Sequence, residues 1–154
     1  MNTITHNNQS GRSMIEMLAV LMIIGIITVT ALAGLNQGMK KYYVSKMHTD
    51  IQSIAQDVAN LYAWKRSYPT SISMNELCTS DIFPDKCDSS STAPNPFGGS
   101  YTVSAAKDSD NTPYLLISAS SMPSDACEDL TLKEWTYVAK EAACSGSTFS
   151  IGLY

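Results

Sequence analysis

The sequence predicts an α+β protein in which one long N-terminal helix packs on an antiparallel β-sheet. Two contrasts within the 154 residues support this fold class. Residues 14–35 are almost entirely apolar and lead into an amphipathic stretch that reaches residue 66. Residues 67–154 are instead rich in Ser and Thr, with short strand-like runs between turn signals.

The apolar segment 14–35 has the length and composition of a membrane helix. It contains 17 apolar side chains among 22 residues and one charged residue, Glu16. As a helix it would span about 33 Å, enough for a hydrocarbon core of about 30 Å. A buried core helix would rarely be apolar on all sides in so small a protein. A cleaved secretory signal is the other alternative, since residues 31–34 imitate a cleavage site, but residues 1–10 carry no Lys or Arg.

After the apolar segment, the spacing predicts that the helix continues to about residue 66. Apolar residues recur there at steps of three and four, and no proline occurs before Pro69. A helix over 14–66 would be about 80 Å long, so its second half is expected to form the spine of a globular head. A coiled-coil dimer is the alternative interpretation. The apolar positions are Leu35, Met39, Tyr42, Met47, Ile51, Ile54, Val58 and Leu61.

The head is expected to combine short helices with strands. Ser73 and Glu76 form a capping-box pattern that predicts a helix over 74–79, and residues 123–130 also indicate a short helix. The composition of residues 89–96 is that of a loop. Strands are predicted at 101–104, 114–118, 135–139 and 149–154, with a hairpin loop at 108–112.

The charge distribution argues against nucleic acid as a partner. Residues up to 66 carry a net charge of +3, whereas those from 67 onward carry −7, and phosphate binding requires a basic face. Gly98 and Gly99 do not begin a nucleotide-binding motif. We expect no enzyme activity and no cofactor, because the sequence has only two histidines, His6 near the N-terminus and His48 on the predicted long helix. A Ser/His/Asp or Cys/His centre would have to recruit its histidine from that helix.

Two groups of acids carry the oxygen ligands that calcium prefers. They lack the ligand order of an EF-hand loop, and solvated surface acids are the ordinary interpretation. No metal site is therefore predicted. The groups are Asp81, Asp85 and Asp88, and Asp125, Glu128 and Asp129.

Residues 11–16, Gly-Arg-Ser-Met-Ile-Glu, precede the apolar run directly. This junction resembles the class III signal of type IV pilins and pseudopilins. The resemblance implies that prepilin peptidase cleaves between Gly11 and Arg12, that Arg12 is N-methylated, and that Glu16 guides subunit assembly. It divides the chain into a leader (1–11), a transmembrane and assembly half of the helix (12–35), an amphipathic half (36–66) and a head (67–154).

Two later stretches are similar to type IVb pilins. Residues 95–101, Asn-Pro-Phe-Gly-Gly-Ser-Tyr, resemble the turn that enters the pilin sheet. Residues 122–127, Met-Pro-Ser-Asp-Ala-Cys, resemble the start of the disulfide-closed C-terminal region. The resemblance thus implies a pilin fold with a disulfide-bonded C-terminal region.

Four cysteines in an exported domain predict two disulfides, for which three pairings are possible. The absence of any Cys-x-x-Cys pair disfavours a zinc or thioredoxin-like site. The cysteines that are close in the sequence are the expected partners, and type IVb pilins close their C-terminal region with a disulfide. The resemblance therefore implies disulfide bonds between Cys78 and Cys87 and between Cys127 and Cys144. Export also conflicts with the positive-inside rule, which would place residues after Lys40, Lys41 and Lys46 in the cytoplasm; the cysteines and the resemblance outweigh that rule.

The expected function is structural. The resemblance implies a type IVb-like pilin that forms a homopolymeric filament for adhesion, aggregation, motility or DNA transfer. Its expected partners are the inner membrane, prepilin peptidase, an assembly ATPase and a platform protein. The precursor would hold its head in the periplasm, and the assembled pilus would be extracellular. The alternatives are a type II secretion pseudopilin or minor pilin, or a signal-anchored periplasmic binding module.

Overall fold

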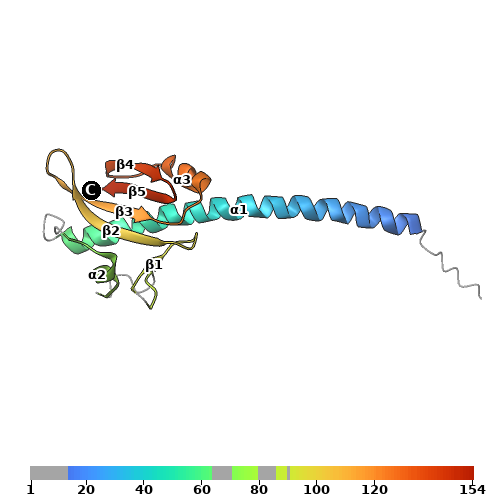
Figure 1. The fold of residues 1–154 in the computed structure, drawn as a ribbon, viewed down its shortest axis with the longest axis horizontal. Helices are drawn as coiled ribbons and strands as arrows, with labels where there is room; N and C mark the ends of the chain where they lie inside the picture. Colours follow the sequence, from blue (N-terminus) through green and yellow to red (C-terminus); the bar gives the residue numbers. More distant parts are fainter. Residues whose placement is uncertain (1–13, 64–70, 80–85, 90) are drawn as a thin grey trace, which may run out of the picture. The chain divides into compact units, whose positions relative to one another are not determined.

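The computed structural model describes residues 14–63, 71–79, 86–89 and 91–154. The chain divides into two compact units, Met1–Met39 and Lys40–Tyr154. Helix α1, Met14–Tyr62, begins in the first unit and ends in the second (Figure 1). It was predicted to reach residue 66, but it ends at Tyr62, followed by a 3₁₀ residue at Ala63; residues 64–66 lie outside the described part.

In the unit Lys40–Tyr154, α1 buries one stripe of side chains. The positions follow the helical period of three and four, so they lie on one face, and they join the core formed by the sheet. Met47 through Val58 match the predicted apolar stripe, whereas Tyr42 and Leu61 remain exposed. The buried stripe consists of Val44, Met47, Ile51, Ile54 and Val58.

The sheet has five antiparallel strands in the order β1-β2-β3-β5-β4. Three of them confirm predicted strands: β2 and β3 have wider bounds than predicted, and β5 is shifted by one residue. Residues 108–112 form the predicted hairpin loop between β2 and β3. The backbone N–H of Asp108 donates to the carbonyl of Thr112 at 3.0 Å. The strands are β1 (Ala93–Pro94), β2 (Ser100–Lys107), β3 (Pro113–Ala119), β4 (Val138–Ser145) and β5 (Thr148–Leu153).

Two strands differ from the sequence prediction. The strand expected at 135–139 begins only at Val138 and extends to Ser145, because Tyr137 has a positive φ of 57° that interrupts extended backbone before β4. The stretch 89–96, expected to be a loop, contains the short strand β1. Pro94 is tolerated there because β1 is an edge strand with a neighbour on one side only.

Two short helices complete the head and confirm the predictions for both. Helix α2 covers Met74–Thr79, and the Ser73 hydroxyl accepts a hydrogen bond from the backbone N–H of Glu76 at 3.3 Å, as a capping box requires. Helix α3 covers Ser124–Thr131 and buries Ala126, Cys127 and Leu130.

Tyr101 on β2 links the sheet to α1 through a partly buried polar contact. Its hydroxyl donates to a carboxylate oxygen of Asp50 at 3.3 Å. Burial raises the pKa of Tyr101 above its ordinary value, and the neighbouring Asp50 raises it further. The phenol therefore stays protonated and keeps its hydrogen bond to α1 at physiological pH.

The turn between β1 and β2 depends on Asn95, whose side chain is buried. Its Oδ1 accepts hydrogen bonds from the backbone N–H groups of Phe97 (2.9 Å) and Gly99 (3.0 Å), and its Nδ2 donates to the carbonyl of Ser120 (2.7 Å). A Cβ at position 99 would lie 2.1 Å from that carbonyl oxygen, so only glycine fits. These contacts give a physical reason for the Asn-Pro-Phe-Gly-Gly motif.

Asn95→Ala is expected to lower the free energy of unfolding by about 2–3 kcal/mol, because it leaves three partners without their hydrogen bonds. Urea unfolding of the purified chain measures the change. Asn75→Ala is the matched control, since Asn75 is exposed on α2, and should change stability by less than about 0.5 kcal/mol. Equal stability of the two variants would contradict the role given to Asn95.

Candidate assembly surface

The segment Met14–Met39 of α1 presents apolar side chains on every side. All of its residues are exposed. Four consecutive side chains, Leu21 to Ile24, are 61%, 72%, 58% and 53% exposed. Because each residue advances about 100° around the helix axis, these four alone cover nearly the whole circumference. Such a surface requires either lipid or other helices around it.

The two threonine hydroxyls of this segment are compatible with an apolar environment. The hydroxyl of Thr28 donates to the carbonyl of Ile24 at 2.8 Å, and that of Thr30 donates to the carbonyl of Ile27 at 2.9 Å. Both hydroxyls are thus satisfied within the helix. In the described part of the chain, α1 is the one helix long and apolar enough to cross a membrane.

Three glycines, Gly25, Gly34 and Gly38, lie within the same segment. A glycine in a helix interior costs about 1 kcal/mol relative to alanine. Apart from the adjacent residues and the helix's own backbone, an added Cβ at any of the three would meet no atom of the described chain within 4 Å. No contact among the described residues therefore explains why these positions lack a side chain.

The predicted processing and assembly residues are only partly described. Gly11 and Arg12 lie outside the described residues. Glu16 lies in the first turn of α1, and its side chain is exposed. It is the single charged residue between Met14 and Met39. The Glu16 carboxylate is therefore exposed to the same lipid or protein environment as the apolar side chains around it.

Two disulfides brace the head, in the pairing that proximity and the resemblance implied. Cys78 of α2 is bonded to Cys87, and Cys127 of α3 is bonded to Cys144 of β4. Cys127 is fully buried, whereas Cys144 is exposed. The second bridge therefore joins a core helix to the edge strand of the sheet.

Helix α1 also contacts the C-terminal region through polar and aromatic side chains. Lys40 forms an ion pair with Asp125 of α3, and its hydrogen bond lowers the pKa of the Asp125 carboxyl. His48 Nε2 donates to the carbonyl oxygen of Glu134 at 2.9 Å, and its ring lies against Trp135 with centroids 4.6 Å apart. His48 is therefore committed to a structural contact.

Trp135 is a residue whose place the sequence did not reveal. It was expected within a strand, but its ring stacks on Phe149 of β5 with centroids 5.7 Å apart and its indole N–H donates to the carbonyl of Leu130 at 3.3 Å. The WxYV pattern of aromatic and β-branched residues is typical of strands. Here the aromatic ring closes the end of the core instead.

The acidic groups considered for calcium do not gather into a site where they are described. Asp81 and Asp85 lie outside the described residues. Asp125 is paired with Lys40, and Glu128 and Asp129 are exposed on α3. Within residues 14–63, 71–79, 86–89 and 91–154, no three His, Cys, Asp or Glu side chains are placed to hold a metal ion.

A comparison with family models matches residues 41–147 to the family described as PilS N terminal. The match covers more than half of the chain and includes α2, α3 and most of the sheet. It lies entirely after the residues that carry the class III signal, so the two observations come from separate parts of the sequence. No curated protein and no solved structure matches the chain significantly.

Proposed function

Since the chain belongs to the pilin-related PilS N terminal family, we propose that it is the structural subunit of a type IVb-like pilus, polymerised through its N-terminal helix. The observation that carries this proposal is the apolar circumference of Met14–Met39, which nothing in the described chain covers. In a precursor, lipid would surround this surface. In a filament, the same surface would pack against the helices of neighbouring subunits.

The unexplained glycines support helix packing in a filament. Gly25, Gly34 and Gly38 have no neighbour among the described residues that requires a glycine. Small residues allow two helix backbones to approach closely where van der Waals packing drives association in apolar surroundings. A contact made only in the assembly accounts for the stability that these glycines cost the isolated helix.

Cleavage of the leader would create the positive charge that pairs with the Glu16 carboxylate. Cleavage after Gly11 would leave the amine of Arg12 as the N-terminus, which is then methylated and remains positive. A carboxylate among apolar helices is stabilised when an opposite charge lies beside it. The terminal amine of a neighbouring subunit would meet Glu16 and set the axial position at which each subunit joins the filament.

The two disulfides support an exported head, because structural disulfides persist in oxidising compartments. The precursor would sit in the inner membrane with its head in the periplasm, and the filament would extend outside the cell. Prepilin peptidase, an assembly ATPase and a platform protein would act on the subunit. The chain itself would have no catalytic role.

The intact mass of the mature protein tests the processing step. We expect a mass that corresponds to residues 12–154 with two disulfides and one added methyl group. Gly11→Val is the control and should retain residues 1–11, because the residue before the cut is changed. A cut near Ala33, or an uncleaved chain that still assembles, would contradict the proposal.

A further inference from the structure

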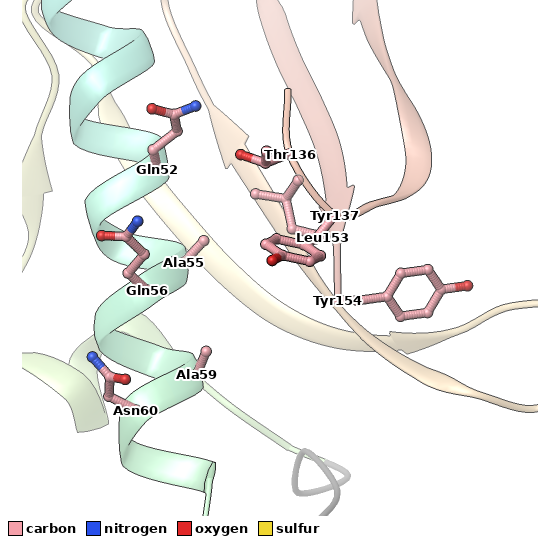
Figure 2. A pocket seen from close by; sticks show the side chains of 9 residues that line it. All are labelled: Gln52, Ala55, Gln56, Ala59, Asn60, Thr136, Tyr137, Leu153 and Tyr154. Atoms are coloured by element: carbon pink, nitrogen blue, oxygen red, sulfur yellow. The ribbon is translucent and has the colours of Figure 1, made fainter. Parts of the chain in front are cut away.

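A groove of about 460 Å³ lies beside the part of α1 that belongs to the head. One wall is α1 and the other is formed by residues around the start of β4 and the end of β5 (Figure 2). Its floor is apolar: the methyl groups of Ala55 and Ala59 turn from α1 toward the strands, and Leu153 lies opposite. The volume is in the range of small-molecule sites, about 300–1,000 Å³.

Three carboxamides line the helical side of this groove. Gln52, Gln56 and Asn60 recur at intervals of four residues, so they lie in a row along α1 with about 6 Å between neighbours (Figure 2). None of the three side chains is hydrogen-bonded to another residue in the described part of the chain. Each amide presents both donors and an acceptor. The row therefore offers hydrogen bonds of both kinds to a ligand.

Tyr137 supplies an aromatic surface on the opposite side. It is 79% exposed, so its ring is open to a ligand. Its backbone is held in the left-handed region (φ 57°), and its carbonyl accepts a hydrogen bond from the N–H of Tyr154 at 2.8 Å. The ring of Tyr154 points away from α1, and its hydroxyl donates to Asp108 at 2.7 Å. Tyr137 is thus the free aromatic ring of the groove.

The lining selects the chemical class of the ligand. No charged side chain is among the residues that line the groove, so an anion would find no counter-charge and the side chains offer only neutral hydrogen-bonding groups. A sugar ring presents hydroxyls that both donate and accept, and an apolar C–H face that packs on an aromatic ring. We propose that this groove binds a neutral oligosaccharide, with its hydroxyls on Gln52, Gln56 and Asn60 and one ring face on Tyr137.

The biological use of this site rests on the proposed pilus function. A shallow site of this kind binds a single sugar weakly. A filament repeats the site in every subunit, and multivalent contact raises the overall affinity by about 10²–10⁴ without any new contact. The groove would then let the filament attach to a glycan-bearing surface.

The test uses the full chain in a zwitterionic detergent that has no sugar headgroup. An array of neutral and sialylated oligosaccharides is the probe, followed by titration of the neutral glycan that binds best. We expect saturable binding of neutral glycans that is weakened about tenfold in Tyr137→Gly and several-fold in Gln56→Ala. Tyr137→Phe should bind as the parent chain does, because it keeps the ring.

Tyr137→Gly also tests whether a loss of glycan binding is caused by unfolding of the chain. Glycine adopts a φ of 57° without strain, so this variant should melt no lower than the parent chain while losing the glycan. Tyr42→Ala is the matched control: Tyr42 is a 63% exposed tyrosine on α1 outside the groove, and its loss should leave binding unchanged. Binding of sialylated glycans only, no glycan binding, or equal loss in Tyr137→Gly and Tyr42→Ala would overturn the proposal.

The assay needs no filament, so its result is separate from that of the assembly experiments. Glycan binding by a chain that never forms filaments would support the groove and overturn the pilus function. Filaments from a chain that binds no glycan would overturn the groove alone. If Tyr137→Gly abolishes filaments while the solubilised parent chain binds no glycan, the groove is a subunit contact, and the proposal of a sugar site is wrong.

Discussion

Replacing Glu16 by valine is expected to abolish filaments while the head stays folded and the precursor stays in the membrane. Valine removes the single charge between Met14 and Met39, so membrane insertion should be at least as favourable as in the parent chain. The neighbouring terminal amine, however, would be left among apolar helices without a counter-charge. Breaking such a pair costs about 3–5 kcal/mol, which corresponds to at least a hundredfold loss of affinity for each added subunit.

Filaments sheared from cells and viewed by electron microscopy measure this effect, and immunoblotting of membranes measures the precursor. Thr28→Val is the matched control. Its hydroxyl bonds the carbonyl of Ile24 in its own helix, so the change removes a polar group of the same apolar segment without removing a partner in another subunit. We expect normal filaments from Thr28→Val. Normal filaments from Glu16→Val would rule out the role given to the acid.

Removing the Cys127–Cys144 bridge is expected to have the largest effect on the stability of the head. The bridge closes a sequence separation of 17 residues, and its loss should cost about 3 kcal/mol through the greater freedom of the unfolded chain. Cys127 is fully buried, so replacing both cysteines by alanine also leaves a cavity beneath α3. Together these effects should lower the melting temperature by about 10 °C or more.

The double alanine variant of Cys78 and Cys87 is the comparison. That bridge closes a separation of nine residues, for which the same entropic effect is about 2.6 kcal/mol, and neither sulfur lies in the fully buried core. Thermal unfolding followed by circular dichroism should therefore show a smaller drop. A larger drop for Cys78 and Cys87 than for Cys127 and Cys144 would contradict the assignment of the second bridge to the core.

The long helix and the core stripe could be predicted because both depend on local periodicity. Met47, Ile51, Ile54 and Val58 are spaced as a buried helical face must be, and the structure buries them. The capping box at Ser73 is likewise a local pattern, and it marks the start of α2 as expected. Such patterns can be recognised in a single sequence because they depend only on residues that are close together along the chain.

The final strands could not be located from local propensity. Trp135 and Tyr137 belong to residue types that favour strands, yet Trp135 packs on Phe149 and the backbone of Tyr137 is left-handed. β4 instead runs through Lys140 and Glu141, which strands disfavour. It forms because β5 offers it backbone partners, and charged side chains are tolerated on a solvent-exposed edge.

The apolar surface of α1 and the groove likewise differ in whether the sequence alone could predict them. The apolar circumference of α1 could be expected from composition, since 22 consecutive residues decide it. The groove could not, because its two walls are separated by more than 70 residues and meet only through the pairing of β5 with its neighbours. The regular spacing of Gln52, Gln56 and Asn60 was the available signal, but polar residues at that spacing are equally typical of a solvated helix face.

The covalent loop closed by Cys127 and Cys144 has a consequence for how this protein can change over generations. No residue between 131 and 148 is fully buried, although α3 before it and β5 after it are core elements. The bridge ties α3, which precedes that stretch, to Cys144 within it, so most substitutions at the exposed positions of the stretch alter the outer face and leave the folded scaffold intact. One scaffold can therefore display many different surfaces, and surface diversity should evolve there faster than anywhere in the apolar segment of α1.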